Sequence, residues 1–460
     1  MLAQTHVNRS VSLSSTDRFF FPTEIKYIPF DGVCVILSPE TANWLIVEVD
    51  DIHLVKRLVA GEKIGAIAAW ARGQGHFAKL QALLAQIISR EFAKTDAPPT
   101  YITDKSVKGA YFYLTNACNL CCSHCYMYSG KSAHGELSVD EWCALVDEFA
   151  QCGGTNITFS GGEILAKRGW LSVIERAHQQ GISITMLTNG TLWDSQTIAK
   201  VAPWIAEVQI SLDGPNEDIN AITRGEGYFI KALEAAKMFE GHGARTSIAM
   251  TPTAKTIDLF ESEFLDFFVK HINGSGINVR IGHKLLNGRA AQMLDKDAQA
   301  RYGAITSRLA NMIYSDSSTR TFVLGHKPNE IGPNCGFGGL SISSTGDIYP
   351  CNRVADVAAL GNIRNTRLAD MMPALDKAES NTDVDKLTPC KGCDLRYICG
   401  GGCRIDDFHL FDGNGRQVSF NKHKFNLPIK LEKINCTDRH RASLLKSMID
   451  AHSYTFSGND

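Results

Sequence analysis

The stretch Asn116–Tyr126, "NACNLCCSHCY", follows the apolar run "AYFYLT" and places four cysteines within eight positions. They stand at positions 118, 121, 122 and 125. Paired in order, they form two C-x2-C motifs, which are typical of a zinc site or a redox dithiol. Read without the second cysteine, they form C-x3-C-x2-C, a three-thiolate cradle for an iron–sulfur cluster. The choice between these registers decides what the protein does.

Composition narrows the class of protein. The chain has 460 residues, 44% hydrophobic and 21% charged, as expected for a globular protein with a large core. A formal net charge of −2 provides no basic footprint, so we expect no nucleic-acid partner. The N-terminus has no apolar run of signal-peptide length, and no stretch is apolar enough to span a bilayer. We therefore expect a cytoplasmic protein without a membrane partner.

The 14 cysteines are unevenly distributed along the chain. Four lie between positions 118 and 125, and seven lie beyond position 334. A reducing cytoplasm does not favour a disulfide framework, whereas clustering of this kind favours metal binding.

Three regions differ in their hydrophobic pattern. Residues 18–98 contain three short strand-like runs followed by apolar residues at helical spacing, which predicts a small winged α+β domain. A polar linker with two prolines, residues 94–100, follows. Residues 105–325 alternate six apolar runs with amphipathic segments, which predicts a partial (βα)6 TIM-like barrel with its active-site loops at the strand C-terminal ends. Ser138 and Glu141 form a predicted capping box.

The last of the six βα units is expected to end in a helix over residues 294–314. Residues 333–440 are rich in Gly and Cys and show few periodic segments. Such a region is expected to need bound metal to hold it together.

The three-cysteine register suits the position of the stretch, directly after the first barrel strand. A zinc ribbon would need a partner knuckle from a distant domain, and a thioredoxin-type dithiol would need a smaller fold. In this register the sequence resembles the radical S-adenosylmethionine (SAM) superfamily. The resemblance implies that Cys118, Cys122 and Cys125 hold three irons of a [4Fe–4S] cluster whose fourth iron chelates SAM. Cys121 would then be a spectator.

Further motifs stand at successive strand ends in the order of that superfamily: "SGGE", "LTNGT", "SLDG" and "ITRGEGYF". The resemblance implies that the Gly-Gly-Glu region binds the SAM amine, that Ser211 binds the ribose or carboxylate region, and that Arg224 pairs with the carboxylate. The full set of implied cofactor-binding residues is Tyr126, Ser160, Gly161, Gly162, Glu163, Asn189, Ser211, Asp213 and Arg224.

The C-terminal cysteines resemble, in order and spacing, the SPASM extension of the superfamily, which carries two auxiliary iron–sulfur clusters. The resemblance implies that a distal group fully ligates one cluster: Cys390, Cys393, Cys399 and Cys436. It assigns a nearer group to the other cluster: Cys335, Cys351 and Cys403. The fourth cysteine that the family often supplies is missing from "GFGGLSISSTGDIYP". The nearer cluster is therefore expected to have an open iron, a non-cysteine ligand or a smaller core.

Residues 18–98 resemble the PqqD-like peptide-recognition element of ribosomal-peptide maturation systems, which binds a leader peptide as an added strand. Together these resemblances imply a maturase that abstracts hydrogen from a precursor peptide and installs a thioether or a C–C or C–O crosslink. Flavodoxin or ferredoxin is the expected electron donor. Two alternatives are a formylglycine-forming sulfatase maturase and a non-enzymatic zinc scaffold. No catalytic proton-transfer residue is assigned, because Tyr228, His283 and Asp347 all have ordinary structural roles available.

Overall fold

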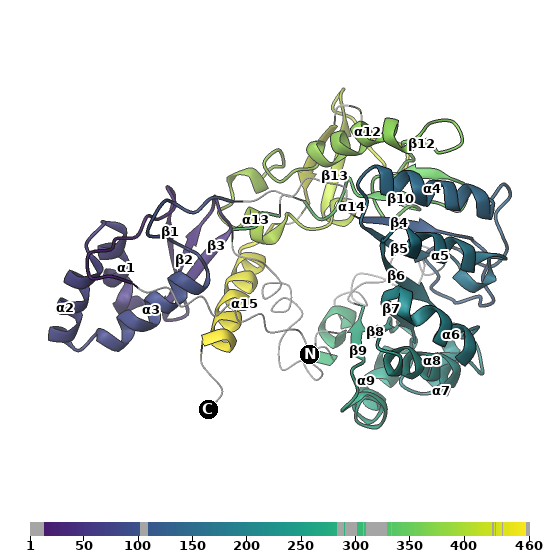
Figure 1. Cartoon of the computed structure of the whole chain (residues 1–460), viewed down its shortest axis with the longest axis horizontal. Coiled ribbons are helices and arrows are strands. Elements are labelled where there is room, and N and C mark those ends of the chain that lie inside the picture. Colours follow the sequence, from purple (N-terminus) through teal and green to yellow (C-terminus); the bar gives the residue numbers. More distant parts are fainter. Residues whose placement is uncertain are drawn as a thin grey trace.

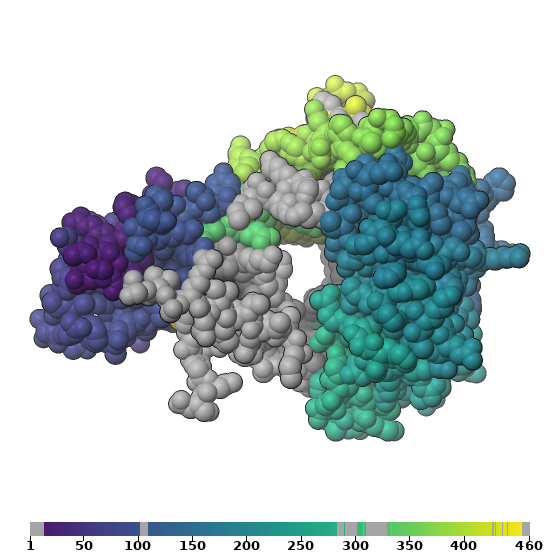
Figure 2. Space-filling model, viewed as in Figure 1, coloured from purple at the N-terminus to yellow at the C-terminus, as the bar shows by residue number. Residues whose placement is uncertain are grey.

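The computed structural model of the chain describes residues 13–101, 109–282, 289, 301–306, 308–309, 329–332, 334–425, 427, 429–434 and 436–456. Three regions follow one another along the chain in Figure 1. An N-terminal unit lies at one end, a sheet with flanking helices lies at the other, and the C-terminal region connects the two. Figure 2 shows the same spatial arrangement in space-filling form, with the C-terminal region lying along the upper edge of the barrel.

The N-terminal unit is a three-stranded antiparallel sheet with three helices. Its strands, in the spatial order β1-β2-β3, are β1 (Lys26–Phe30), β2 (Val33–Ser38) and β3 (Asn43–Glu48). The helices that follow are α1 (Ile52–Val59), α2 (Ile64–Gln74) and α3 (Phe77–Ser89). One core of buried residues between Phe19 and Ala93 joins the helices to one face of the sheet. The opposite face of the sheet packs against the C-terminal region.

The central domain is the expected α/β barrel fragment. Its parallel strands are β4 (Gly109–Tyr113), β5 (Asn156–Ser160), β6 (Ser183–Thr188), β7 (Ile205–Ser211), β8 (Arg245–Met250) and β9 (Asn278–Ile281). Its helices are α4 (Val139–Gln151), α5 (Trp170–Gln179), α6 (Ser195–Val201), α7 (Glu217–Arg224), α8 (Phe229–Gly241) and α9 (Ile257–Phe267). Helix α4 starts with the capping box predicted at Ser138 and Glu141. Of the expected helix 294–314, residues 301–306 and 308–309 are helical, and the rest lies outside the described residues.

The barrel sheet does not end at β4. Strand β10 (Leu340–Ile342) of the C-terminal region pairs in parallel with β4, Leu340 lying opposite Ala110. Strands β11 (Asp347–Tyr349) and β12 (Gly361–Asn362) continue the sheet, which within the described residues has nine strands in the order β12-β11-β10-β4-β5-β6-β7-β8-β9. Because β10 completes the hydrogen bonding of the β4 edge, the C-terminal region and the barrel share one sheet.

The C-terminal region has more regular structure than its composition predicts. It contains α12 (Leu368–Asn381), α13 (Arg396–Cys399), α14 (Arg404–Asp407), α15 (Asp438–Phe456) and a small sheet of β13 (Phe408–Asp412), β14 (Gln417–Val418) and β15 (Ile429–Lys433). Short helical turns elsewhere in the chain are Val49–Asp51, Ile164–Ala166, Ala202–Trp204, Phe268–Ile272 and Cys390–Gly392. A buried cluster that includes Phe337, Val384 and Phe425 forms a core of its own. The expectation of few periodic segments in residues 333–440 was wrong for α12, which is a full helix, and α15 lies mostly beyond these residues.

Helix α15 joins the C-terminal region to the N-terminal unit, beside β3 in Figure 1. The sheet face opposite α1–α3 presents Val35, Leu37, Trp44 and Ile46, and these pack against Leu444, Leu445, Met448 and Ala451 of α15. Leu395 and Ile398 of the α13 segment belong to the same cluster. In the part of the chain that is described, no helix is long and apolar enough to cross a membrane.

Candidate active site and cluster-binding cavities

A cavity of about 330 Å³ opens at the C-terminal ends of the barrel strands, where the fold predicts the active site. Most of the residues predicted from sequence line it: Cys118, Cys122, Cys125, Tyr126, Ser160, Gly161, Gly162, Asn189, Ser211 and Arg224. The sequence reasoning missed further lining residues, among them His124, Ser129, Gln209 and Thr251. Strand ends far apart in sequence therefore converge on the cysteine loop.

The two glycines after β5 allow that strand end to press against the root of the cysteine loop. A Cβ atom on Gly161 would lie 2.4 Å from the carbonyl oxygen of Thr115, and one on Gly162 would lie 2.2 Å from that of Ala117. The amide of Gly162 donates to Thr115 O at 2.7 Å, and that of Glu163 donates to Ala117 O at 2.8 Å. Any side chain here would push the loop away, so the glycines serve the approach of two backbones.

Each of the three cysteine sulfurs receives N–H donors. The amides of Leu120 and Ser129 lie 3.4 Å from the sulfurs of Cys118 and Cys125, respectively. The sulfur of Cys118 also accepts from Asn189 Nδ2 at 3.8 Å, and that of Cys122 from Arg224 Nη1 at 3.9 Å. Burial raises the pKa of the Cys122 thiol to about 11, the carboxylate of Asp213 acts in the same direction, and Arg224 opposes both. Such donors suit thiolates that bind iron, because hydrogen bonds to sulfur tune a cluster.

His124 and Arg224 converge on one buried carboxylate. Arg224 Nε lies 2.6 Å from Asp213 Oδ2, and His124 Nε2 lies 3.2 Å from the same oxygen. Burial alone would raise the pKa of Asp213, but the charges of Arg224 and His124 lower it to about 2. Asp213 lies behind the cavity wall and acts through these two cavity-lining residues. The position of His124 between two of the cysteines was a signal in the sequence that could have pointed to it.

Glu163 also lies behind the wall, with its side chain fully buried. Its carboxylate accepts from Thr188 Oγ1 and from the amide of Asn189, both at 2.7 Å. Burial raises the pKa of Glu163, against the effect of these donors. These hydrogen bonds make Glu163 a link between the C-terminal ends of β5 and β6. Direct binding of SAM by Glu163 or Asp213 is an untested prediction that this placement does not favour.

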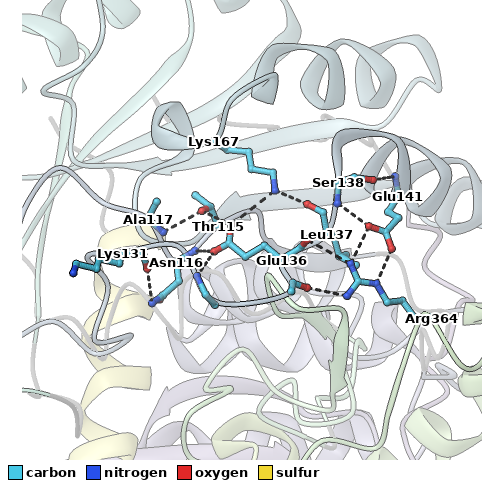
Figure 3. A network of polar contacts seen from close by, with 12 residues as sticks. Thr115, Asn116, Ala117, Lys131, Glu136, Leu137, Ser138, Glu141, Lys167 and Arg364 are labelled. Carbon is cyan, nitrogen blue, oxygen red and sulfur yellow. Dashed lines mark hydrogen bonds and ion pairs between the residues drawn. The ribbon is translucent and has the colours of Figure 1, made fainter.

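Glu136 holds the root of the cysteine loop, as Figure 3 shows. Its carboxylate accepts from Thr115 Oγ1 and from the amides of Asn116 and Ala133, at 2.7, 2.7 and 2.9 Å. Lys167 Nζ lies 3.8 Å away and also donates to the carbonyl of Leu137. At the start of α4, Arg364 of the C-terminal region forms a two-pronged ion pair with Glu141.

The distal cysteine group meets in a second cavity, of about 300 Å³. Its walls include all four members, Cys390, Cys393, Cys399 and Cys436. His440 Nε2 lies 3.4 Å from the sulfur of Cys399, and Arg441 Nη1 lies 3.9 Å from that of Cys393. Burial would raise the pKa of Cys399, but His440 and Lys433 bring it below the usual range for a thiol.

The nearer cysteine group is linked by Arg353. Its amide lies 3.5 Å from the sulfur of Cys351, and its Nη1 lies 3.6 Å from that of Cys403. Cys335 and Cys403 both act electrostatically on Cys351, whose pKa burial raises to about 12. Arg353 is neutralised by Asp356 and Asp406, each at 2.7 Å.

The donor sets are thiols with N–H donors beside their sulfurs, which suits iron–sulfur clusters, because the thiolates of a cluster bind separate irons. Among the described residues, no group of three or more His, Cys, Asp or Glu side chains is placed to hold one metal ion. Of the residues considered for proton transfer, Tyr228 and Asp347 do not line the barrel cavity, and His283 lies outside the described residues.

Comparisons with known proteins agree with this arrangement. Residues 112–261 match the sequence model of the radical SAM superfamily, and residues 334–394 match SPASM, an iron–sulfur cluster-binding domain. Mycofactocin maturase MftC of Mycolicibacterium smegmatis is 27% identical over 308 residues, covering 64% of this chain and 77% of the relative. AdoMet-dependent heme synthase of Oleidesulfovibrio alaskensis is 25% identical over 329 residues, covering 65% and 82%.

A solved structure of anSMEcpe with bound AdoMet superposes with a TM-score of 0.53 at 17% identity, covering 76% of this chain and 98% of that one. At this identity the likeness establishes the fold alone. The predicted partial barrel with a cysteine-rich C-terminal domain is therefore confirmed.

Proposed function

We propose that this chain, a radical SAM enzyme with a SPASM iron–sulfur domain, matures a ribosomally made precursor peptide by installing an oxidative crosslink. The observation that carries the proposal is the combination of parts in one chain. A cavity lined by the three-cysteine motif and a sheet unit with a cavity of about 280 Å³ beside its edge strand are joined through the region that holds the C-terminal cysteines. Neither a zinc scaffold nor a small-molecule enzyme needs that combination.

The cofactors are SAM, a [4Fe–4S] cluster and auxiliary iron–sulfur clusters. When bound, they supply a 5′-deoxyadenosyl radical by reductive cleavage of SAM, which is chemistry of the cofactor and not of the side chains. We assign Cys118, Cys122 and Cys125 to the cluster, and Asn189 and Ser211 to SAM. Arg224 is fixed by Asp213 with its charge directed toward Cys122, which suits an anionic cofactor group.

The outer edge of β3 supports leader binding in the N-terminal unit. Strand β3 ends the sheet order, and the side-chain amide of Gln86 pairs with it as a neighbouring strand would. Gln86 Oε1 accepts from Ile46 N at 3.2 Å, and its Nε2 donates to Ile46 O at 3.0 Å. A cavity of about 280 Å³ lies beside this contact, walled by β3, α3 and Ile449 of α15. An extended leader would replace the Gln86 amide and continue the sheet.

The catalytic proposal is tested with anaerobically purified, reduced enzyme, SAM and a candidate precursor peptide. We expect the peptide to stimulate 5′-deoxyadenosine formation and to lose two hydrogen atoms, measured by mass spectrometry. Replacing Cys118, Cys122 and Cys125 by Ala should abolish SAM cleavage, whereas Cys121→Ala is the matched control and should keep it. Reductive SAM cleavage by the triple variant would contradict the assignment.

The leader site is tested by fluorescence anisotropy with labelled peptide. Gln86→Ala leaves both backbone groups of Ile46 without a partner in the free protein, so we expect tighter leader binding, by roughly tenfold. Gln81→Ala, at an exposed position of the same helix, is the control and should leave affinity unchanged. Unchanged or weaker binding of the peptide by the Gln86 variant would contradict the proposal that the leader pairs with the β3 edge.

Heme-synthase relatives favour one competing function, action on a tetrapyrrole, because they match this chain over nearly the same share of its length as the maturases. A formylglycine-forming reaction is the other. Mass spectrometry separates all three, because crosslinking removes two hydrogens and leaves the residues joined, formylglycine formation leaves an aldehyde, and a tetrapyrrole reaction leaves the peptide unchanged.

A further inference from the structure

Two tyrosine hydroxyls of the barrel form hydrogen bonds with the loop that follows Cys351. Tyr113, at the end of β4, donates to the carbonyl oxygen of Asn352 at 2.5 Å. The hydroxyl of Tyr126 accepts from the amide of Ala355 at 3.0 Å. Each contact spans more than two hundred residues of sequence. The loop at residues 351–356 is thus tied to the barrel at two points.

One end of this connection lies at the radical site. Tyr126 follows Cys125 directly and lines the barrel cavity. Tyr113 does not line the cavity and is buried beside it. Burial raises the pKa of both phenols, so each keeps its proton at neutral pH.

The other end lies at the nearer cysteine group. Within the loop, Arg353 contacts the sulfurs of Cys351 and Cys403 and is held by Asp356 and Asp406. The side-chain oxygen of Asn352 accepts from the Cys351 thiol at 3.6 Å. A shift of the loop against the barrel would therefore move ligands of the nearer cluster relative to the cavity.

We propose that Tyr113 and Tyr126 are positioning residues that hold the nearer auxiliary cluster at a fixed separation from a substrate in the barrel cavity. The inference rests on the proposed function. Closing a crosslink on a peptide radical forms one new bond and releases one proton, which passes to water, and one electron. A nearer cluster held by Cys335, Cys351 and Cys403 would, in its oxidised form, take up that electron. Since electron transfer depends steeply on separation, two hydroxyl contacts that fix the loop also fix the efficiency of this step.

The test compares Tyr113→Phe and Tyr126→Phe with Tyr111→Phe in the holoenzyme. Tyr111 lies on the same strand as Tyr113, and its variant is the matched control. We expect faster hydrogen exchange at residues 351–356 in both test variants and a shifted midpoint potential of the nearer cluster. Neither readout requires a peptide.

Because Tyr113 lies outside the cavity, its variant should keep peptide-independent SAM cleavage while crosslinked product per SAM cleaved falls several-fold. Unchanged exchange, potential and product ratio in both variants would overturn the inference. If wild-type enzyme crosslinks no peptide but the exchange and potential shifts occur, the positioning role stands and the proposed substrate class fails.

Discussion

The C-terminal region joins its two neighbours in different ways. It meets the barrel through a shared sheet, with β10 paired to β4, and through polar contacts such as Arg364 with Glu141. It meets the N-terminal unit mainly through an apolar patch, where α15 packs on the sheet face, and Asn329 adds polar contacts to Asn43 and Glu91. Strand pairing and directed polar contacts fix distance and orientation, whereas an apolar patch is non-directional.

The two junctions also connect different cysteine groups to their neighbours. The barrel junction holds the nearer cysteine group beside the barrel, where Tyr113 and Tyr126 contact the loop after Cys351. The other junction attaches the N-terminal unit to the distal group, because α15 begins two residues after Cys436, and its residues His440 and Arg441 contact the sulfurs of Cys399 and Cys393. The apolar junction is therefore the one that we expect to open more readily.

The largest effect is expected from Met448→Asp, which breaks the apolar junction. Met448 is fully buried between α15 and the sheet. An unpaired charge there costs on the order of 3 kcal/mol or more, enough to undock the N-terminal unit. Hydrogen exchange in β2 and β3 should rise and peptide-stimulated turnover should fall, while peptide-independent SAM cleavage persists. The exposed neighbour Lys446→Asp is the control. Loss of SAM cleavage in the Met448 variant would show that the two junctions are not independent.

An intermediate effect is expected from Glu136→Gln on the barrel side. The side chain is 9% exposed and accepts three hydrogen bonds at the root of the cysteine loop. An amide presents N–H where at least one of these donors points, so we expect a loss of about 2 kcal/mol in stability. Thermal unfolding and the iron content at the radical site measure it. Glu234→Gln, exposed on α8, should change neither. Full iron content with unchanged stability would mean that Glu136 does not hold the loop.

The smallest effect is expected from Arg364→Ala, which removes one polar contact while the shared sheet remains. Both partners are partly exposed, so the loss should be below about 1 kcal/mol. Arg364, together with the hydrogen bonds of Ser138, lowers the pKa of Glu141 to about 2, so the contribution of Arg364 is complete above about pH 4.5 and is lost as the pH falls toward 2. The stability difference from wild type should be constant between pH 8 and about 5. Arg367→Ala, at an exposed position 3.6 Å from Glu148, is the control. A stability difference that changes between pH 8 and 5, or that equals the effect of Arg367→Ala, would contradict a stabilising Arg364–Glu141 ion pair.

Much of the fold could be predicted because its signals are local. The six barrel strands follow from short apolar runs, and the capping box of α4 follows from two residues three apart. Ten of the cavity-lining residues were named from motifs at strand ends. Helices α12 and α15 were missed although neither contains a cysteine, and α12 contains Pro373, which interrupts a helical pattern in the sequence. His124 was missed because its partner Asp213 lies 89 positions away in sequence and only the fold brings them together.

Local sequence was enough to determine the C-x3-C-x2-C motif and the barrel repeats, because each depends on residues a few positions apart. The class of chemistry and the two C-terminal cysteine groups were predicted from the resemblance of such motifs to a known family. The tertiary structure alone decided the rest. It paired β10 with β4, placed two tyrosine hydroxyls on the loop after Cys351, and set α15 against the N-terminal sheet. These contacts join residues more than two hundred positions apart in sequence, and their free energy depends on which surfaces the folded chain buries together.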